Sequence, residues 1–201
     1  MAALGKLLRS TGHVDYLGQI YGPGEVDQPP RPAEYALGTF VQLPLATSPE
    51  MALVGVIGDT LLLSPAFGAL GPRLTPEVDL ALFAPDYVNE KAVLVAILAL
   101  GTLDANGQAD QSLPALAALT DTEFEPLSAA RLLAFHTAGR GLRLAYAARL
   151  LALDNPLALA LLRLIIHQLR QLPLTADQLA VLAVLRTQLA WQQQVRPFGA
   201  E

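Results

Sequence analysis

The chain has 201 residues, and its composition favours a well-packed interior over disorder. Hydrophobic residues make up 53% of the sequence and charged residues 15%, whereas about a quarter of the residues are charged in typical soluble domains. The formal net charge is −5, and the absence of cysteine excludes disulfides, zinc–thiolate sites and a cysteine nucleophile.

The charge is unevenly distributed along the chain. Residues 1–126 contain five basic and fifteen acidic residues, whereas residues 127–201 contain eight arginines and three acidic residues. The net charges of the two parts are therefore −10 and +5. Such an asymmetry is typical of a surface for nucleic acid or a protein partner, or of attraction between two halves or between subunits. We favour attraction between halves or subunits, because a duplex-binding face clusters its charges more densely.

Short apolar runs and turn residues in the first hundred positions indicate β-strands. Apolar and polar residues alternate with a period of two, which is typical of half-buried strands. Glycines lie inside these runs at positions 18, 38 and 55, and interior glycines favour the bulges and bends of a small barrel. We expect strands at residues 3–9, 13–21, 35–43, 53–57 and 93–103.

Two parts of this N-terminal region are less clearly patterned. Residues 93–103 contain enough Ala and Leu for a helix, although the β-branched residues and the turn after them favour a strand. Residues 64–91 are interrupted repeatedly by prolines and glycines, which break any long element. The pattern assigns neither a strand nor an ordered loop to that segment.

From residue 127 onward the apolar residues follow the 3.6-residue period of helices. Ser128 and Asn155 are expected N-caps, and Thr175 forms a capping box with Gln178. We expect helices at residues 128–138, 142–153, 157–171 and from 175 to Trp191 or a little beyond. Because the connections are short, neighbouring helices should be antiparallel and form a three- or four-helix bundle.

The sequence therefore predicts an α+β protein of two unlike parts. A β-barrel domain at residues 1–107 is followed by a polar, acidic linker at 108–126 and a helical bundle at 127–201. The apolar segments 92–101 and 150–166 are too short, or too interrupted by polar residues, to cross a membrane. Because the first residues also lack the apolar core of a signal peptide, we expect a cytoplasmic protein.

Four N-terminal segments follow the order of strands in one known barrel family. They are GKLLRST at 5–11, the alternating strand at 14–21, YALGTFV at 35–41 and VGVI at 54–57. This layout resembles the HerA–ATP synthase barrel, or HAS-barrel, which HerA-type translocases share with ATP synthase catalytic subunits. The resemblance covers about residues 1–103 and does not extend to the helical half.

The resemblance implies an assembly role. In that family the barrel is a non-catalytic collar for ring assembly and partner docking, and catalysis belongs to a following ATPase domain. A HerA-like partner, either the ring ATPase or its nuclease, would place the chain in DNA processing. For the helical half, which the resemblance does not cover, we expect a surface for homo-oligomerisation or for a partner. No motor is expected here, because neither Lys6 nor Lys91 stands in a Gly-x-x-x-x-Gly-Lys-Ser/Thr phosphate loop.

The sequence contains no pattern typical of catalysis or of cofactor binding. His13, His136 and His167 lack the i, i+4 spacing of metal ligands on a helix, and no Gly-x-Ser-x-Gly elbow occurs. His136 stands near the expected end of a helix, where positive side chains suit the helix dipole, and we expect it to face solvent. We therefore expect no enzymatic activity, no cofactor and no metal.

Basic residues of the helical half form the candidate surface for an anion or a protein partner. Spacings of four and three residues place Arg163, His167 and Arg170 on one helical face. The full candidate set is Arg140, Arg143, Arg149, Arg163, His167 and Arg170. Binding of nucleic-acid phosphates by this set is the alternative function, although aromatic residues for base stacking are sparse nearby. Trp191 is expected to anchor a core or an interface.

Overall fold

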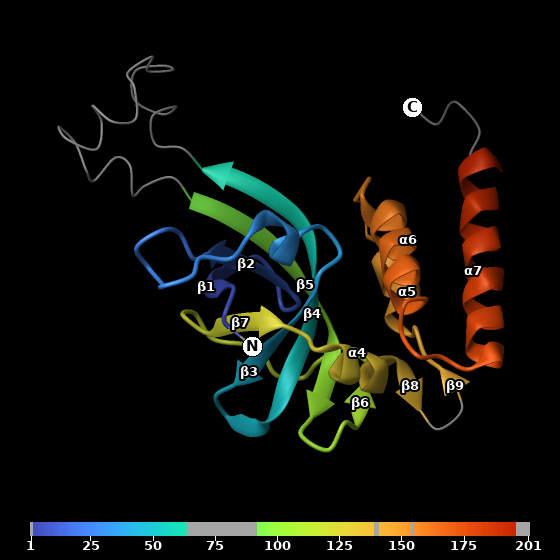
Figure 1. The fold of residues 1–201 in the computed structure, drawn as a ribbon, viewed down its shortest axis with the longest axis horizontal. Helices are drawn as coiled ribbons and strands as arrows, with labels where there is room; N and C mark the ends of the chain where they lie inside the picture. The colour runs from blue at the N-terminus through green and yellow to red at the C-terminus, as the bar shows by residue number, and fades with distance from the viewer. Residues whose placement is uncertain (1, 64–91, 139–140, 154, 196–201) are drawn as a thin grey trace, which may run out of the picture.

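Six strands form a closed antiparallel barrel in the N-terminal part of the chain (Figure 1). The computed structural model describes residues 2–63, 92–138, 141–153 and 155–195. The strands pair in the order β2-β1-β7-β3-β4-β5, and pairing of β2 with β5 closes the cylinder. Their bounds are β1 (Gly5–Ser10), β2 (Asp15–Ile20), β3 (Phe40–Leu45), β4 (Ser48–Leu63), β5 (Ala92–Asp104) and β7 (Glu123–Pro126). The expected N-terminal β-barrel is confirmed.

The strand positions follow the sequence pattern with two differences. β2 and β5 lie close to the expected ranges, and β5 is a strand rather than the alternative helix. β3 begins only at Phe40, because the 3₁₀ helix η1 (Pro32–Tyr35) occupies the start of the expected range. The expected strand at 53–57 is the centre of the much longer β4. Residues 64–91 lie outside the described residues.

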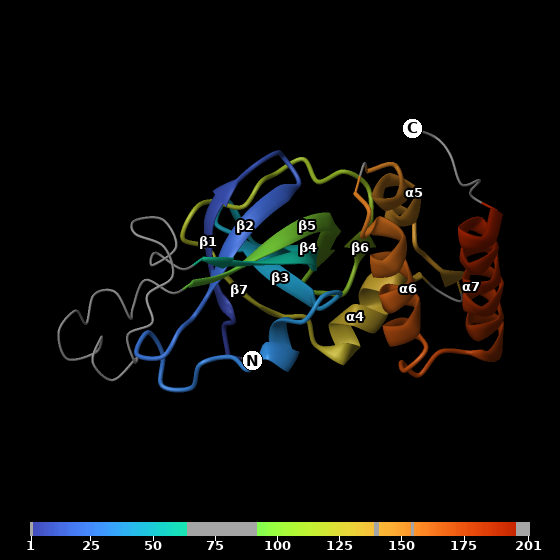
Figure 2. The same ribbon diagram turned by 90° about the horizontal axis from the view of Figure 1, so that it is seen from above.

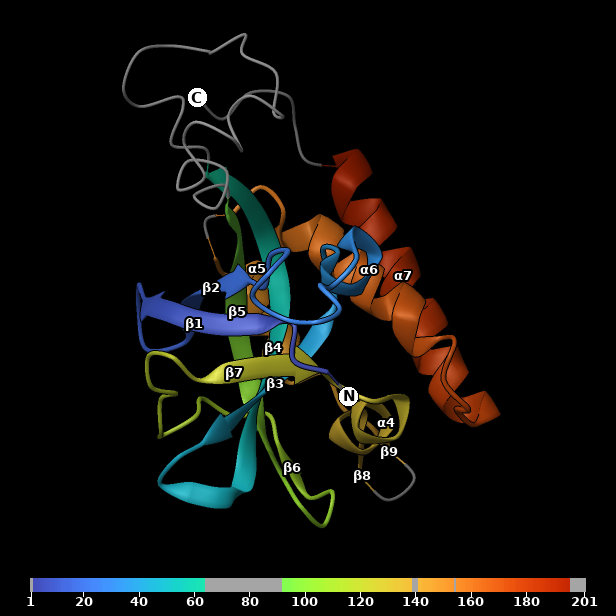
Figure 3. The same cartoon turned by 60° about the vertical axis from the view of Figure 1, so that its left-hand side comes forward.

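The polar segment at 108–126, expected as a linker, contributes two strands to the sheet. β6 (Ala109–Asp110) pairs with β5, and β7 lies between β1 and β3, as Figure 3 shows. The side chain of Phe124 in β7 is fully buried inside the barrel. A Cβ atom at Gly18 would lie only 2.5 Å from the Phe124 ring, so the glycine provides the space for that ring. The segment therefore completes the barrel wall.

The centre of β4 is buried on both faces, which explains its unbroken apolar sequence. Leu53 and Ile57 point into the barrel core, whereas Val54 and Val56 belong to a second core outside the barrel. The register of β4 against β5 shifts at Gly55. A side chain at position 55 would place Cβ 2.6 Å from Ile97, so a bulge and close packing both depend on this glycine.

Four helices follow the barrel within the described residues. They are α4 (Ala129–His136), α5 (Tyr146–Leu151), α6 (Ala158–Leu169) and α7 (Ala176–Val195). Two of the expected caps are present: Ser128 Oγ accepts from the Arg131 N–H at 3.3 Å, and Thr175 and Gln178 exchange bonds of 3.0 and 3.4 Å. The expected N-cap Asn155 is wrong, because the N-cap position of α6 is Leu157 and Asn155 bonds the Leu157 N–H ahead of the helix. α5 begins later than expected because a hairpin of β8 (Thr137–Ala138) and β9 (Gly141–Leu142) precedes it.

The helices form layers beside the barrel. α5 and α6 lie between the barrel and α7, which is the outermost layer (Figures 1 and 2). The second core joins strand residues, such as Phe40 and Leu100, to helix residues, such as Phe135, Leu161 and Leu182. The chain is therefore α+β as expected, but the expected separate bundle is not confirmed, because the helices share their core with the barrel.

Candidate interaction surfaces

Two of the candidate arginines contact backbone carbonyls of the sheet. Arg149 Nη2 donates to the carbonyl of Leu100 in β5 at 2.8 Å, which ties α5 to the barrel. Arg143 Nη1 lies 3.5 Å from the carbonyl of Ala109 in β6. The Ser112 backbone N–H and hydroxyl donate to the Asp110 carboxylate, and these bonds, with the nearby Arg143, lower the pKa of Asp110. Arg140 lies outside the described residues.

The other three candidates share the exposed side of α6. Arg163, His167 and Arg170 are all exposed, and the buried positions of α6 lie on its opposite side. The expected common face is therefore present on the helix. Arg143 and Arg149 lie at the barrel contacts and do not extend this face. The structure thus divides the described candidates between two places instead of gathering them into one site.

His136 is buried, so the expectation that it faces solvent is wrong. Its Nδ1 atom lies 2.9 Å from the Leu132 carbonyl, which only accepts hydrogen bonds, and its Nε2 atom lies 2.7 Å from the Tyr146 hydroxyl. The imidazole therefore carries its proton on Nδ1, and Tyr146 donates to Nε2. Burial lowers the pKa of His136 to about 4. The group is neutral at physiological pH and serves the packing of α4 against α5.

Gln111 is a buried polar residue that the sequence pattern did not single out, because it lies in the expected linker. Its Nε2 atom donates to the carbonyls of Phe135 and Arg143 at 2.8 and 3.1 Å. Its Oε1 atom accepts from the Ala145 N–H at 2.7 Å. These three bonds fix the connection between α4 and α5 on the barrel, so this amide has a structural role.

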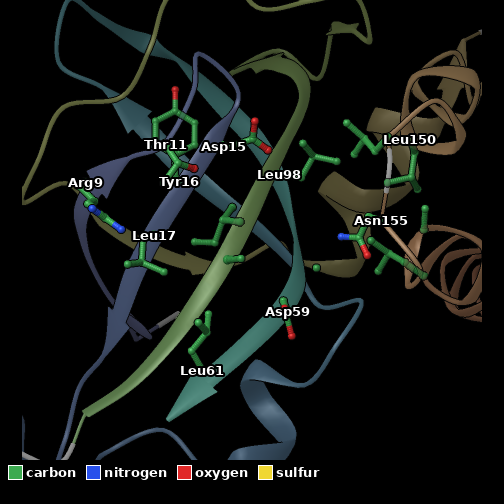
Figure 4. A pocket seen from close by; sticks show the side chains of 16 residues that line it. Arg9, Thr11, Asp15, Tyr16, Leu17, Asp59, Leu61, Leu98, Leu150 and Asn155 are labelled. Carbon is green, nitrogen blue, oxygen red and sulfur yellow. The ribbon is translucent and has the colours of Figure 1, made fainter. Parts of the chain in front are cut away.

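A groove of about 330 Å³ lies between the barrel and the helices (Figure 4). Figure 4 shows Asp15 and Asp59 on the barrel side and Leu150 and Asn155 on the helix side. Its walls are mainly apolar, and Leu98 lies between the two sides. Both strands and helices build the groove, so the packing of the helices onto the barrel creates it.

Several polar groups of the groove already serve the local backbone. Asp59 Oδ1 accepts from the Thr60 N–H, and Asn155 Oδ1 accepts from the Leu157 N–H, both at 2.8 Å. No histidine or lysine lines the described groove, and histidine is the commonest general acid or base. Among residues 2–63, 92–138, 141–153 and 155–195, no three His, Asp or Glu side chains are grouped to hold a metal ion.

The outer side of α7 exposes apolar side chains. From Ala176 to Trp191 the buried positions are Gln178, Leu182 and Leu189, and the two leucines belong to the second core. On the side turned away from them, Val184 is 57% exposed and Trp191 is 62% exposed. Of the two roles expected for Trp191, the core role is therefore wrong, and the interface role stays a prediction.

Charges are nearly absent from this face. Helical geometry places Ala180, Val184, Thr187 and Trp191 on a common line opposite the buried positions. Across the 20 residues of α7, Asp177 and Arg186 are the only charged residues. We call the exposed side formed by Ala176, Ala180, Ala183, Val184, Thr187 and Trp191 the outer face of α7. The sequence carries a signal for this face, because apolar residues fall on all sides of the α7 segment instead of on one stripe.

Comparison with known proteins identifies one family. The model of a family described as a domain of unknown function, DUF8166, matches residues 1–198. No curated protein matches the sequence. Within the described part of the chain, no helix combines the length and the apolar composition that crossing a bilayer requires. The family match includes the barrel and every described helix, so the outer face of α7 lies within the family domain.

Proposed function

Since the chain belongs to the DUF8166 family, whose description assigns no activity, we propose from its geometry that it is a non-catalytic interaction module that joins an assembly through the outer face of α7. The observation that carries this proposal is the exposure of Val184 and Trp191 on a helix whose only charged residues are Asp177 and Arg186. The free energy of a complex falls when a partner removes exposed apolar residues from water. Tryptophan in particular is enriched among the residues that dominate binding energy.

The rest of the molecule is consistent with a scaffold for this face. α6 separates α7 from the barrel, and the shared core fixes the helix layers on a rigid cylinder (Figure 2). A rigid platform reduces the conformational entropy that is lost when a partner binds. The groove between barrel and helices has polar groups that are used by the neighbouring backbone, which supports a structural role for it.

The test compares assemblies that form with the intact and the altered face. We would isolate three tagged proteins from the source cells: the wild type, the Ala180→Glu variant and the Ala148→Glu variant. Native mass spectrometry then measures the mass of the complex that each protein forms. Ala180 and Ala148 are both exposed helix residues, so the control introduces the same charge on α5. We expect the wild-type and Ala148→Glu proteins in a complex and the Ala180→Glu protein alone. The same complex in all three samples, or a single chain in all three, would overturn the proposal.

For the barrel, we propose docking to a HerA-type ring ATPase or to its nuclease, and this partner class rests on the resemblance of residues 1–103. A closed six-stranded barrel is compatible with a collar role. Gel filtration of the purified chain mixed with the ATPase, and separately with the nuclease, tests this step. Co-elution with one of them is the expected result. Unchanged elution of all components would remove this partner class and leave the role of α7 intact.

Direct nucleic-acid binding is less well supported. Arg149 donates to the barrel, and the exposed face of α6 offers only Arg163, His167 and Arg170 from the candidate set. Phosphate binding predicts an affinity that falls steeply with salt. We expect fluorescence anisotropy at physiological salt to detect no binding of single-stranded or duplex DNA. Tight, salt-dependent binding that weakens in an Arg170→Ala variant would instead favour the nucleic-acid function.

A further inference from the structure

We propose that a second copy of this chain covers the outer face of α7, with the two α7 helices antiparallel and a two-fold axis near Val184. This inference rests on the proposed function, because it names the occupant of the same face. Closed two-fold dimers are the commonest oligomers of soluble proteins. In such a dimer the same patch contacts itself, so the patch must complement its own shape and charge.

The sizes of the side chains make the face self-complementary only in the antiparallel arrangement. Its N-terminal half carries the small residues Ala176 and Ala180, and its C-terminal half ends in the large Trp191. An axis at Val184 places residue 191 of one helix beside residue 177 of the other. Each tryptophan then lies over the alanines of the second copy. A parallel arrangement would instead set Trp191 against Trp191 and leave the alanines facing a gap.

The charges agree with the same arrangement. No charged residue lies between Ala180 and Val184 or between Thr187 and Trp191, so a second copy brings no like charges together at the centre of the face. Antiparallel helices also oppose their dipoles favourably. The axis at Val184 brings the indole N–H of Trp191 close to Asp177 of the second copy, and a buried tryptophan usually finds such an acceptor.

The length of the helix sets the strength of this contact. Twenty residues span about 30 Å, and one pair of such helices buries less than the roughly 800 Å² per partner of standard stable interfaces. We therefore expect a reversible dimer, whose mass approaches twice the 21.3 kDa of the chain only as concentration rises. Light scattering over a concentration series measures this change. The Ala180→Glu variant should stay monomeric throughout, and the Ala148→Glu control should dimerise as the wild type does.

The absence of cysteine makes the geometry directly testable by cross-linking. A disulfide needs Cβ atoms about 4 Å apart, so single substitutions report which positions meet. We expect the Val184→Cys variant to form a disulfide dimer under mild oxidation and the exposed Ala148→Cys control to form none. A mixture of Ala180→Cys and Gln188→Cys proteins should give more mixed dimer than either protein gives alone, because an axis at 184 sets these positions at the same level along the two helices.

The outcomes separate the inference from the proposed function. Cross-linking of Ala180→Cys with itself, but not with Gln188→Cys, would show a parallel pair and overturn the antiparallel arrangement. A purified chain that stays monomeric, with no more cross-linking of Val184→Cys than of Ala148→Cys, would overturn the second copy as occupant. If the Ala180→Glu change still removed a different protein from the cellular complex, the proposed function would stand while this inference fell.

Discussion

The Nε2 atom of His136 lies 2.7 Å from the hydroxyl oxygen of Tyr146, and both side chains are shielded from solvent. Phe40 and Phe135 pack edge-on against the imidazole, so the pair has no access to water as an alternative partner. The Leu132 carbonyl binds the Nδ1 proton and fixes the tautomer. Tyr146 is therefore the donor on which the buried Nε2 atom depends.

A Tyr146→Phe substitution should destabilise the protein by about 1–3 kcal/mol, because it leaves the buried Nε2 atom without a donor. The free energy of unfolding in urea measures this loss. Tyr21→Phe is the matched control, since the Tyr21 hydroxyl donates to Glu123 at an exposed position and should change stability by roughly 0.5 kcal/mol or less. Equal effects of the two substitutions would contradict the structural role of the buried pair.

His136 should make stability fall with acid. Its pKa is about 4 in the folded state against 6.5 for the free side chain, so the unfolded chain binds more protons between these values. Stability is then fully present above pH 6.5 and decreases progressively as the pH falls to about 4, by about 3 kcal/mol in total. Urea titrations of the wild type and a His136→Gln variant over this range isolate the effect. If the free energy of unfolding changed with pH in the same way for both proteins, His136 would not be the cause of the acid sensitivity.

A Gly18→Ala substitution should destabilise the barrel by about 1–3 kcal/mol, because the added methyl group would lie 2.5 Å from the Phe124 ring. Gly58→Ala is the control, since its methyl group would meet Leu161 at an ordinary 3.6 Å. Thermal unfolding of both variants gives the comparison. If Gly18→Ala were neutral, β7 would not pack inside the barrel as described.

Loss of Arg149 should cost more stability than loss of Arg170. Arg149→Ala removes the 2.8 Å bond to the Leu100 carbonyl and the packing of its aliphatic stem, at a cost of about 1–3 kcal/mol. Arg170 is exposed, and its replacement by Ala should stay within about 0.5 kcal/mol of the wild type. Chemical denaturation measures both values. A larger loss from Arg170→Ala would refute the division of roles between the two arginines.

The sequence predicted the elements whose signals are local. Ser128 and the Thr175–Gln178 box mark helix starts through short-range hydrogen bonds, and the structure contains those bonds. It did not predict β7, because Glu123 and Glu125 make that segment polar and only pairing with β1 and β3 turns it into a strand. Long-range pairing of this kind leaves no periodic signal in a segment of four residues.

The candidate site shows the same limit. The spacing of Arg163, His167 and Arg170 correctly gave a common face on α6. Whether a basic residue meets a ligand or the protein itself depends on tertiary packing, and Arg149 proves to bind a barrel carbonyl. His136 shows this most clearly, because a position that looks like an exposed helix end is covered by Phe40 and Tyr146.

Burial of β4 on both faces has a consequence for truncated forms of the protein. A chain that stops before the helices would form a barrel whose outer wall exposes Val54, Val56 and Leu100 to water. A fragment with the helices alone would present the complementary side, including Leu161 and Ile165. Each piece would expose its half of the shared core, so we expect neither piece to fold without the other.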